Sequence, residues 1–535
     1  NETKAPNGTA AKSADKPLAI DLPGIASRLY EVPVPAGNYQ QLEATAKHLL
    51  WLARDTGFDA KTHLRQLEIT HKEPKAKTLV EDVRSYELSS DRKKVLVRKG
   101  DAFHVIASDA GAPAKLDDKF DLGGWTFSLV PQEEWRQIFN ESWRMLRDYF
   151  YDRGMHQLDW AAARQKYLPL VDRVSDRAEL STVIAEMVGE LSTLHIYVRF
   201  GDERDGPDQV NPAAFGARLR RDTDAGGWRV AQIFQSDPDY PGQVSPFRRP
   251  EVDIQVGDVI TGINGRATLS ESRLESLLRN QADRQMLLEL KPGGTNETRT
   301  VVVKPISNDR EAGLRYDDWE YTRRLRVEEL GRGQIGYVHL RAMGQENITE
   351  WAREYYPVFQ RQGLIIDVRN NQGGNIDSWI LGKLLRKAWF YWQPRVGQPS
   401  WNMQYAFRGH LVVLCNERTA SDGEAFAEGF KRLGLGKVIG TRTWGGEIWL
   451  SARRWLVDSG MATAAETGVY GPEGQWLIEG HGVDPDIVVD NLPHATFKGA
   501  DAQLEAAVKH LQELIARDPR PVTPKPQYPD KRFPK

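Results

Sequence analysis

A serine at a predicted junction between a strand and a helix could act as a nucleophile. Ser421 lies in the stretch GHLVVLCNERTASDGEAFAE, residues 409–428. The apolar run within it, residues 410–415, is long enough for a buried strand and too short for a stable helix. Helix-favouring residues follow, with carboxylates in the first turn. Unpaired amides at such a helix start would stabilise an oxyanion on an attacked carbonyl. A capping serine without a catalytic role is the alternative, and this stretch by itself favours the cap.

Two adjacent glycines follow a second predicted buried strand. The strand GLIIDVR, residues 363–369, runs directly into NNQGGN. Glycines at this position permit backbone geometries that other residues avoid, and they let a ligand approach closely. The amides of Gly374 and Asp422 would then be the two donors that an oxyanion hole needs. A plain turn is the alternative.

A histidine and a carboxylate are needed to activate such a serine. His195, where GELSTLHIYVRF changes from a helical to a β-branched and aromatic pattern, is a candidate general base among eleven histidines. Glu479 in WLIEGHGVDPD is a candidate for the carboxylate that orients the base. The spacing leaves rivals open: His481 as the base, and Asp484 or Asp486 as the carboxylate.

The composition is that of a globular protein of several domains. The chain has 535 residues, 40% of them hydrophobic and 27% charged, and its formal net charge is -2. This charge gives no general attraction to nucleic acid or to anionic membranes. One cysteine, Cys415, excludes an intrachain disulfide framework and a multi-cysteine metal site. No apolar stretch approaches the ~20 residues of a membrane-spanning helix, so we expect no membrane insertion.

The sequence patterns predict a multidomain α/β protein. Short strands with turn residues between them indicate about two antiparallel four-stranded units, typical of propeller blades. A helical period then replaces the strand period, and strands alternate with helices in the later part of the chain. The expected parts are a flexible lead-in at 1–24, an antiparallel β region ending a propeller-like domain at 25–130, a helical subdomain carrying His195 at 131–205, a PDZ-like domain at 206–310, an α/β core at 311–517 and a Pro-rich tail at 518–535.

The segment EVDIQVGDVITGINGRAT resembles part of a PDZ domain. It combines a Gly-Asp turn, a short apolar strand at 259–263 and an Asn-Gly turn, and a helix is expected at 270–280. Such domains bind an extended peptide as an added strand, often holding its terminal carboxylate on backbone amides. A small β insert without a ligand is the alternative.

The later strands and helices predict a mainly parallel sheet with right-handed βαβ connections. In such sheets, sites lie beyond the carboxyl ends of the strands. Both Ser421 and the glycine pair fall at this edge.

Five motifs together resemble the C-terminal-processing, or tail-specific, serine peptidase family, and more closely its tricorn branch. They are ELSTLHIYV, the PDZ-like segment, IIDVRNNQGGN, RTASDGE and IEGHGVDPD, and they cover roughly residues 130–514. The resemblance implies a core of the ClpP/crotonase type and a homo-oligomer, a hexamer in the tricorn branch. It also implies a site with Ser421 as nucleophile, His195 as base, Glu479 as the distal carboxylate, and Gly374 and Asp422 as oxyanion amides.

The sequence departs from the tricorn pattern at two places. Tricorn has a serine immediately before the histidine, whereas this chain has Leu194. Either Thr193 or Ser192 substitutes in the relay to Glu479, or Glu479 reaches His195 directly or through water. The region expected to select basic substrate residues reads KAWFYWQPRVG, residues 387–397, and offers aromatics instead of a carboxylate. The substrate side-chain preference therefore stays open.

We expect a serine peptidase that acts on oligopeptides or unfolded protein segments, without a metal or an organic cofactor. A peptide-binding scaffold with an impaired relay is the main alternative, and an acyl-CoA enzyme of the crotonase type ranks lower. The first residue is Asn1 and no signal sequence precedes it, so we expect the natural start to be missing. The compartment, cytoplasmic or periplasmic, is left open.

Overall fold

The computed structural model describes residues 21–29, 31–57, 60–70, 72–116, 119–120, 122, 124, 126–204, 206–295, 297–450 and 455–533. Its contacts divide the chain into two units, Asn1–Leu129 and Val130–Lys535. The expected flexible lead-in lies outside the described residues except for 21–24. None of the described helices is long and apolar enough to cross a membrane.

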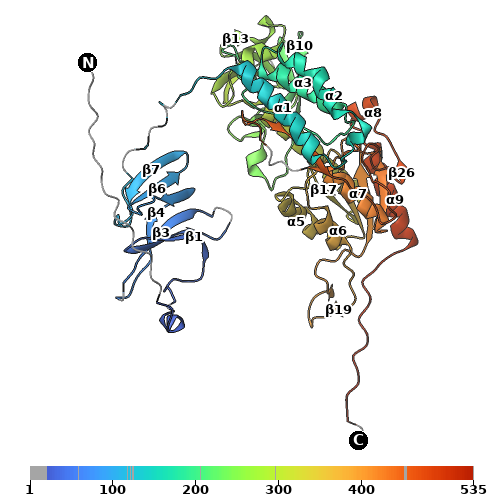
Figure 1. Cartoon of the computed structure of the whole chain (residues 1–535). Helices are drawn as coiled ribbons and strands as arrows, with labels where there is room; N and C mark the ends of the chain where they lie inside the picture. Colours follow the sequence, from blue (N-terminus) through green and yellow to red (C-terminus); the bar gives the residue numbers. More distant parts are fainter. Residues whose placement is uncertain are drawn as a thin grey trace. The chain divides into compact units, whose positions relative to one another are not determined.

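The first unit is built from two antiparallel sheets (Figure 1). One contains β1 (Asn38–Ala44), β2 (His48–Arg54), β3 (Thr62–Glu68) and β4 (Lys77–Val80), and the other contains β5 (Ser85–Leu88), β6 (Lys94–Lys99) and β7 (Ala102–Ala107). A short 3-10 helix, Ile25–Arg28, precedes them. Apolar side chains of both sheets share one core, which includes Leu50, Leu64, Leu79, Val95 and Val97. The sequence predicted two four-stranded units, and the second sheet has three strands among the described residues.

Three helices begin the second unit: α1 (Pro131–Tyr149), α2 (Trp160–Val171) and α3 (Arg177–Gly189). Asp159 and Asp176 cap α2 and α3 by accepting from backbone amides of the first turn. The helices share a core with residues from 448–465. The chain then pairs β8 (Val198–Arg199) with β24 (Met461–Ala462), which brings the segment after α3 to the distant part of the chain.

A small β domain follows and matches the PDZ-like expectation. Its sheet order is β10-β11-β12-β14-β15, and its helix at Leu274–Leu278 is a 3-10 helix, shorter than the helix expected at 270–280. Of the remaining strands, β13 pairs with β12 of this sheet, and β9 pairs with β16. The bounds are β9 (Ala213–Ala214), β10 (Ala217–Asp222), β11 (Gly227–Ile233), β12 (Val259–Ile263), β13 (Arg266–Ala267), β14 (Met286–Lys291), β15 (Arg299–Val303) and β16 (Ile306–Ser307).

The core of the second unit is a parallel sheet, as the sequence predicted, in the order β17-β18-β21-β22-β26. Its strands are β17 (Ile335–His339), β18 (Gly363–Asp367), β21 (His410–Cys415), β22 (Gly436–Gly440) and β26 (Ile487–Val488). The helices are α4 (Asn308–Gly331), α5 (Asn347–Val358), α6 (Asp377–Leu384), α7 (Asp422–Arg432), α8 (Pro493–Phe497) and α9 (Ala502–Arg517). Short pairs complete this part: β19 (Tyr391–Trp392) with β20 (Ser400–Trp401), and β23 (Trp449–Leu450) with β25 (Ala465–Thr467).

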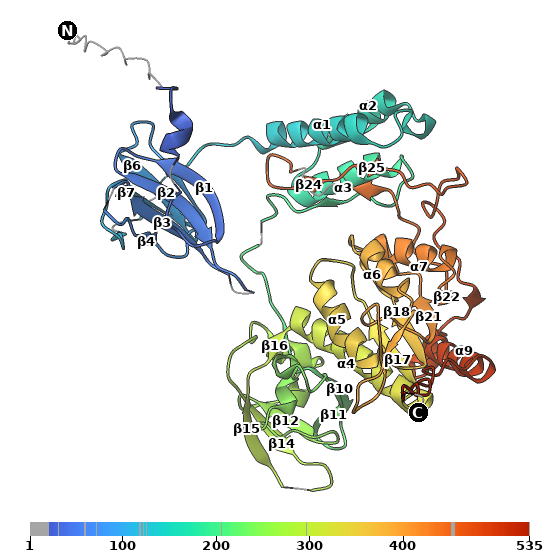
Figure 2. The same cartoon turned by 90° about the horizontal axis from the view of Figure 1, so that it is seen from below.

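Helices cover both faces of this sheet, which explains why its strands are apolar throughout (Figure 2). Because the strands lie in chain order and their crossovers keep one hand, α5, α6 and α7 pack on the same face. The helices α4 and α9 pack on the other face. Alternate residues of β21 face the two layers, since Val413 belongs to one core and Val412 to the other. This packing fixes the carboxyl ends of β18 and β21 side by side.

Candidate functional site

Ser421 lies at the start of α7 with a backbone conformation that few non-glycine residues adopt. Its φ is 54° and its ψ is -125°. Such conformations cost about 1–3 kcal/mol and persist only where surrounding contacts enforce them. Glu424 enforces this one, because its Oε2 accepts from the Ser421 main-chain N–H at 3.0 Å. Ser421 is therefore the N-cap residue of α7, as the capping alternative expected, and also sits on a strained turn where a nucleophile can be exposed.

The glycine loop after β18 packs directly against Ser421. A Cβ atom built on Gly373 would lie 2.6 Å from the Ser421 Cβ and 3.0 Å from its Oγ. The φ of Gly373 is 80°, in the left-handed region. A Cβ on Gly374 would lie 2.0 Å from the carbonyl carbon of Met343. Both positions therefore have room for glycine only. At Gly373 any larger residue would clash with Ser421.

Asn371 holds this loop in place from its centre. Its side chain is fully buried. Its Oδ1 accepts from the Gly373 N–H at 2.8 Å, its Nδ2 donates to the Leu340 carbonyl at 2.7 Å, and its own carbonyl accepts from Ala420 at 3.0 Å. One asparagine thus ties the glycine loop to the residue immediately before Ser421.

The amides of Gly374 and Asp422 donate no hydrogen bond to any other residue that the structure describes. The Asp422 side chain holds the chain beyond the glycines, since its Oδ2 accepts from Ile376 at 2.7 Å and from Asp377 at 3.0 Å. Burial, together with the Asp377 carboxylate, raises the pKa of Asp422 to about 7. Two free N–H groups beside a serine are the donors that would meet a developing oxyanion.

His195 is held by a carbonyl group that fixes its tautomer. The residue is 8% exposed, and its Nδ1 lies 2.7 Å from the Ile448 carbonyl oxygen. Because a carbonyl can only accept, Nδ1 carries the proton, and Nε2 of the neutral ring has a free lone pair. Burial lowers the pKa of His195, while the hydrogen bond to Ile448 and the charge of Glu479 oppose this shift. The imidazole is therefore kept as a neutral base.

Glu479 accepts hydrogen bonds from main-chain amides near His195 and none from the imidazole itself among the described residues. Its Oε2 accepts from the amides of Glu447 at 2.7 Å and Ile448 at 3.1 Å. Its Oε1 accepts from the amide of Leu194 at 3.2 Å. The carboxylate thus acts on His195 through the main chain at Leu194 and Ile448 and through its charge.

The predicted relay through a side-chain hydroxyl is not formed in the described structure. The Thr193 hydroxyl donates to the Leu191 carbonyl at 3.3 Å, and neither it nor Ser192 bonds to Glu479. The main-chain amide of Leu194 donates to Glu479 instead. This donor is present whatever side chain position 194 carries. The leucine side chain is 43% exposed.

Residues 443–448 connect the serine to the histidine. Glu424, the residue that caps Ser421, also accepts from the Thr443 hydroxyl at 2.5 Å, from Gly445 at 2.7 Å and from Gly446 at 3.0 Å. The Trp444 amide donates to the Thr419 carbonyl at 3.1 Å, and its ring lies 6.0 Å from the His195 ring. The segment then ends at the carbonyl that orients His195. The hydroxyl and the imidazole are not hydrogen-bonded to each other within the described residues, but one short segment contacts both parts of the site.

Buried acids surround this connection. Burial raises the pKa of Glu424, because desolvation outweighs the four hydrogen bonds that it accepts. Burial and the charges of Glu424 and Asp422 raise the pKa of Glu447 to about 9. The Glu447 carboxyl is therefore neutral at pH 7, which removes a negative charge from the surroundings of the base.

The rival residues lie in a different environment. His481 Nε2 is 2.7 Å from Asp484 Oδ2, and both side chains are more than half exposed. Asp486 accepts from the amide of Val438 at 2.8 Å and pairs with Lys437. Among the described residues, neither carboxylate forms a hydrogen bond with the segment 443–448 that holds His195. The geometry therefore favours His195 with Glu479 over these alternatives.

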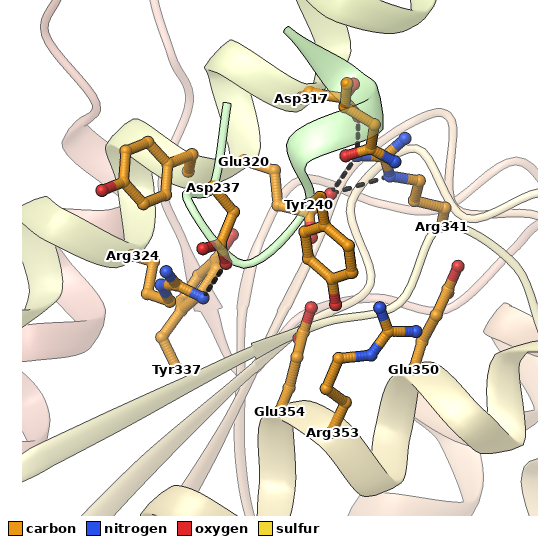
Figure 3. Close-up of a pocket in the computed structure, with 12 residues that line it drawn as sticks. Asp237, Tyr240, Asp317, Glu320, Arg324, Tyr337, Arg341, Glu350, Arg353 and Glu354 are labelled. Atoms are coloured by element: carbon orange, nitrogen blue, oxygen red, sulfur yellow. Dashed lines mark hydrogen bonds and ion pairs between the residues drawn. The ribbon is translucent and has the colours of Figure 1, made fainter. Parts of the chain in front are cut away.

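A polar cavity of about 190 Å³ is lined by residues of the PDZ-like domain and of the core (Figure 3). Arg324 of α4 pairs with Asp237 of the PDZ-like domain at 2.6 Å. Arg341 pairs with Asp317 at 2.7 Å, and its carbonyl accepts from the Gln372 amide at 2.9 Å. Direct contacts through α4 thus connect the PDZ-like domain with the loop beside Ser421.

Four residues that build the site were not among the sequence candidates. Glu424 had a readable signal, because Ser421-x-x-Glu424 has the spacing of a capping box. Asn371 stood inside the NNQGGN motif, but its role depends on contacts with distant segments. Trp444 and Ile448 had no local signal, since one acts through packing and the other through a carbonyl group. No cluster of side chains able to hold a metal ion occurs in the described ranges.

Comparisons with known proteins agree with this architecture. Family models match residues 131–189 as the tricorn protease C1 domain, 214–308 as the tricorn protease PDZ domain and 334–489 as peptidase family S41. Tricorn protease homolog 1 of Streptomyces coelicolor is 33% identical over 521 residues, which cover 94% of this chain and 48% of the relative. The tricorn protease of Thermoplasma acidophilum is 32% identical, over 91% of this chain and 44% of its own.

A solved structure extends the similarity to three dimensions. The crystal structure of the tricorn protease superposes with a TM-score of 0.80 at 28% identity, covering 91% of this chain and 47% of that one. The chain belongs to the tricorn branch of peptidase family S41. This chain is a multidomain α/β protein with a PDZ domain and the S41 peptidase fold, as the sequence predicted. The chain spans about half the length of the tricorn relatives named here.

Proposed function

We propose that this chain is a serine peptidase that hydrolyses peptide bonds in oligopeptides or unfolded protein segments. The observation that supports the proposal is the arrangement around residues 443–448. A strained Ser421 and two amides with no acceptor among the described residues lie at the start of α7 and the glycine loop, and a neutral imidazole is tied to the same connecting segment. Membership of a peptidase family supports it.

In the proposed reaction, Ser421 Oγ attacks the peptide carbonyl carbon and His195 Nε2 takes the hydroxyl proton. The amides of Gly374 and Asp422 donate to the oxyanion of the tetrahedral intermediate. His195 then gives its proton to the leaving amine, and a water molecule releases the acyl group by the same steps. The missing bond between Ser421 and His195 fits a free enzyme, because catalytic hydrogen bonds often tighten only when substrate is bound.

Labelling with a fluorophosphonate tests the nucleophile, since this probe reacts with activated serines. We expect the wild-type protein to be labelled and the Ser421→Ala variant to remain unlabelled. Ser378→Ala is a matched control. The Ser378 hydroxyl donates to Asp377 within α6, so its removal should leave labelling unchanged. Failure to label the wild-type protein would favour the alternative of a peptide-binding scaffold.

The Glu479→Gln variant should move the acidic limb of the kcat/KM profile to lower pH. The charge of Glu479 raises the pKa of His195, so its removal lowers that pKa and keeps the base form at lower pH. An interaction of about 1 kcal/mol corresponds to a displacement of roughly 0.7 pH unit.

The profile is measured for wild type, Glu479→Gln and the control Asp484→Asn, which neutralises the carboxylate beside His481. Asp422 also titrates near pH 7, but it is present in all three proteins, so the difference isolates Glu479. An unmoved limb in Glu479→Gln, or an equal displacement in Asp484→Asn, would assign the orienting role to another group.

A further inference from the structure

The open edge of the PDZ-like sheet borders a cavity of about 510 Å³ that is lined by both apolar and polar side chains. β10 ends the sheet order and pairs only with β11 among the described strands (Figure 2). Ala217 and Leu219, two residues apart on this strand, both line the cavity, and Leu274 and Leu278 line it from the 3-10 helix. An extended peptide can add to this edge as a strand and place every second side chain in the cavity.

The place expected for a peptide carboxylate is already occupied by a side chain of this protein. Gly216, with a φ of 67°, lies immediately before β10, and its amide donates to Glu311 Oε2 at 2.9 Å. Glu311 comes from the first turn of α4, and its Oε1 accepts from Arg315 at 3.1 Å. Domains of this type use backbone amides beside the edge strand to hold a terminal carboxylate. Here, a carboxylate of the chain itself takes the hydrogen bond.

A second carboxylate at this amide would meet an unfavourable environment. Glu311 is half-buried, with its side chain 16% exposed, so solvent screens its charge only in part. A free peptide end would have to displace Glu311 from Gly216 or approach it as a like charge. An internal peptide segment carries no charge at this point and needs no displacement.

We propose that Glu311 acts as an internal substitute for a terminal carboxylate, so that the groove selects internal segments of an unfolded polypeptide over free carboxyl ends. The ligand class is an extended segment with small or aliphatic side chains at alternate positions, which matches the cavity lining. The proposal rests on the proposed function in so far as the bound segment is the peptidase substrate. It changes the expectation that the PDZ-like domain holds the carboxyl end of its ligand.

The test compares two forms of one peptide. A fluorescein-labelled octapeptide of alternating Leu and Ala is prepared as the free acid and as the carboxyl-terminal amide, and its binding is followed by fluorescence anisotropy. All proteins carry Ser421→Ala, so that hydrolysis does not interfere and failure of the proposed activity is measured separately by labelling. We expect the amide to bind at least about tenfold more tightly than the acid, since every factor of ten is a 1.4 kcal/mol difference.

The Glu311→Gln variant should remove this preference by improving binding of the acid at least about tenfold, while the amide changes little. Glu311→Ala should do the same, and alanine maintains the helix of α4. Glu271→Gln is the matched control, because Glu271 pairs with Arg266 in the same domain and is not among the residues that line the cavity, so its preference should stay that of the parent. Tighter binding of the acid by the parent, an acid-to-amide ratio unchanged by both Glu311 variants, or no binding of either form would overturn the proposal.

Discussion

Replacing either Ser421 or His195 with Ala should lower kcat for peptide hydrolysis by about 10⁴- to 10⁶-fold. The serine variant loses the atom that forms the acyl bond, and the histidine variant loses the group that takes and returns the proton. KM should change much less, because neither side chain is expected to supply uniform binding energy. Steady-state kinetics with an internally quenched peptide measures both quantities.

The double variant sharpens this prediction. Groups that act as one unit have non-additive effects, so Ser421→Ala combined with His195→Ala should be about as slow as either single variant. His481→Ala is the matched control, because this histidine forms an exposed pair with Asp484, and its kcat should stay near that of the wild type. A loss in His481→Ala equal to that in His195→Ala, or fully multiplicative losses in the double variant, would contradict the proposed pair.

The Gly373→Ala substitution should lower kcat by at least about 10²-fold, although it adds only one methyl group. The new Cβ would lie 2.6 Å from the Ser421 Cβ, in a contact too short to persist. The loop or the serine must therefore move, and both the nucleophile and the Gly374 amide leave their places. The left-handed φ of Gly373 adds strain for alanine.

Gly382→Ala provides the matched control for this change. Gly382 lies in α6, and no atom lies within 4 Å of the position of its added Cβ. Alanine favours a helix by about 1 kcal/mol over glycine, so this variant should be as active as the wild type and slightly more stable. Thermal unfolding and kcat are measured for both variants. Full activity in a folded Gly373→Ala protein would show that the glycine loop does not position the reacting groups.

The sequence was most informative where local pattern and topology agree. Buried apolar runs at 363–367 and 410–415, each followed by turn residues, predicted parallel strands whose loops meet at one edge. Because that edge is common to all such sheets, the proximity of Ser421 and the glycine pair followed from the strand assignment alone.

The sequence was least informative where a distant backbone group decides the geometry. Any residue at position 448 would present the same carbonyl to His195, so no side-chain pattern marks this contact. Glu479 contacts the main chain at Leu194, and the side chains of Thr193 and Ser192 do not reveal this contact. The expected helix at 270–280 is shorter because its apolar residues Leu274, Leu277 and Leu278 can pack from a single 3-10 segment.

The bond between His195 and Ile448 joins residues 253 positions apart in the chain. Closing so long a loop costs conformational entropy that local helices and hairpins do not pay. Contacts of this kind form late, after the sheets and helices that they connect have folded. Recovery of activity during refolding should therefore lag behind recovery of helical circular dichroism, and a delay in docking the helical subdomain would by itself keep newly made chains inactive.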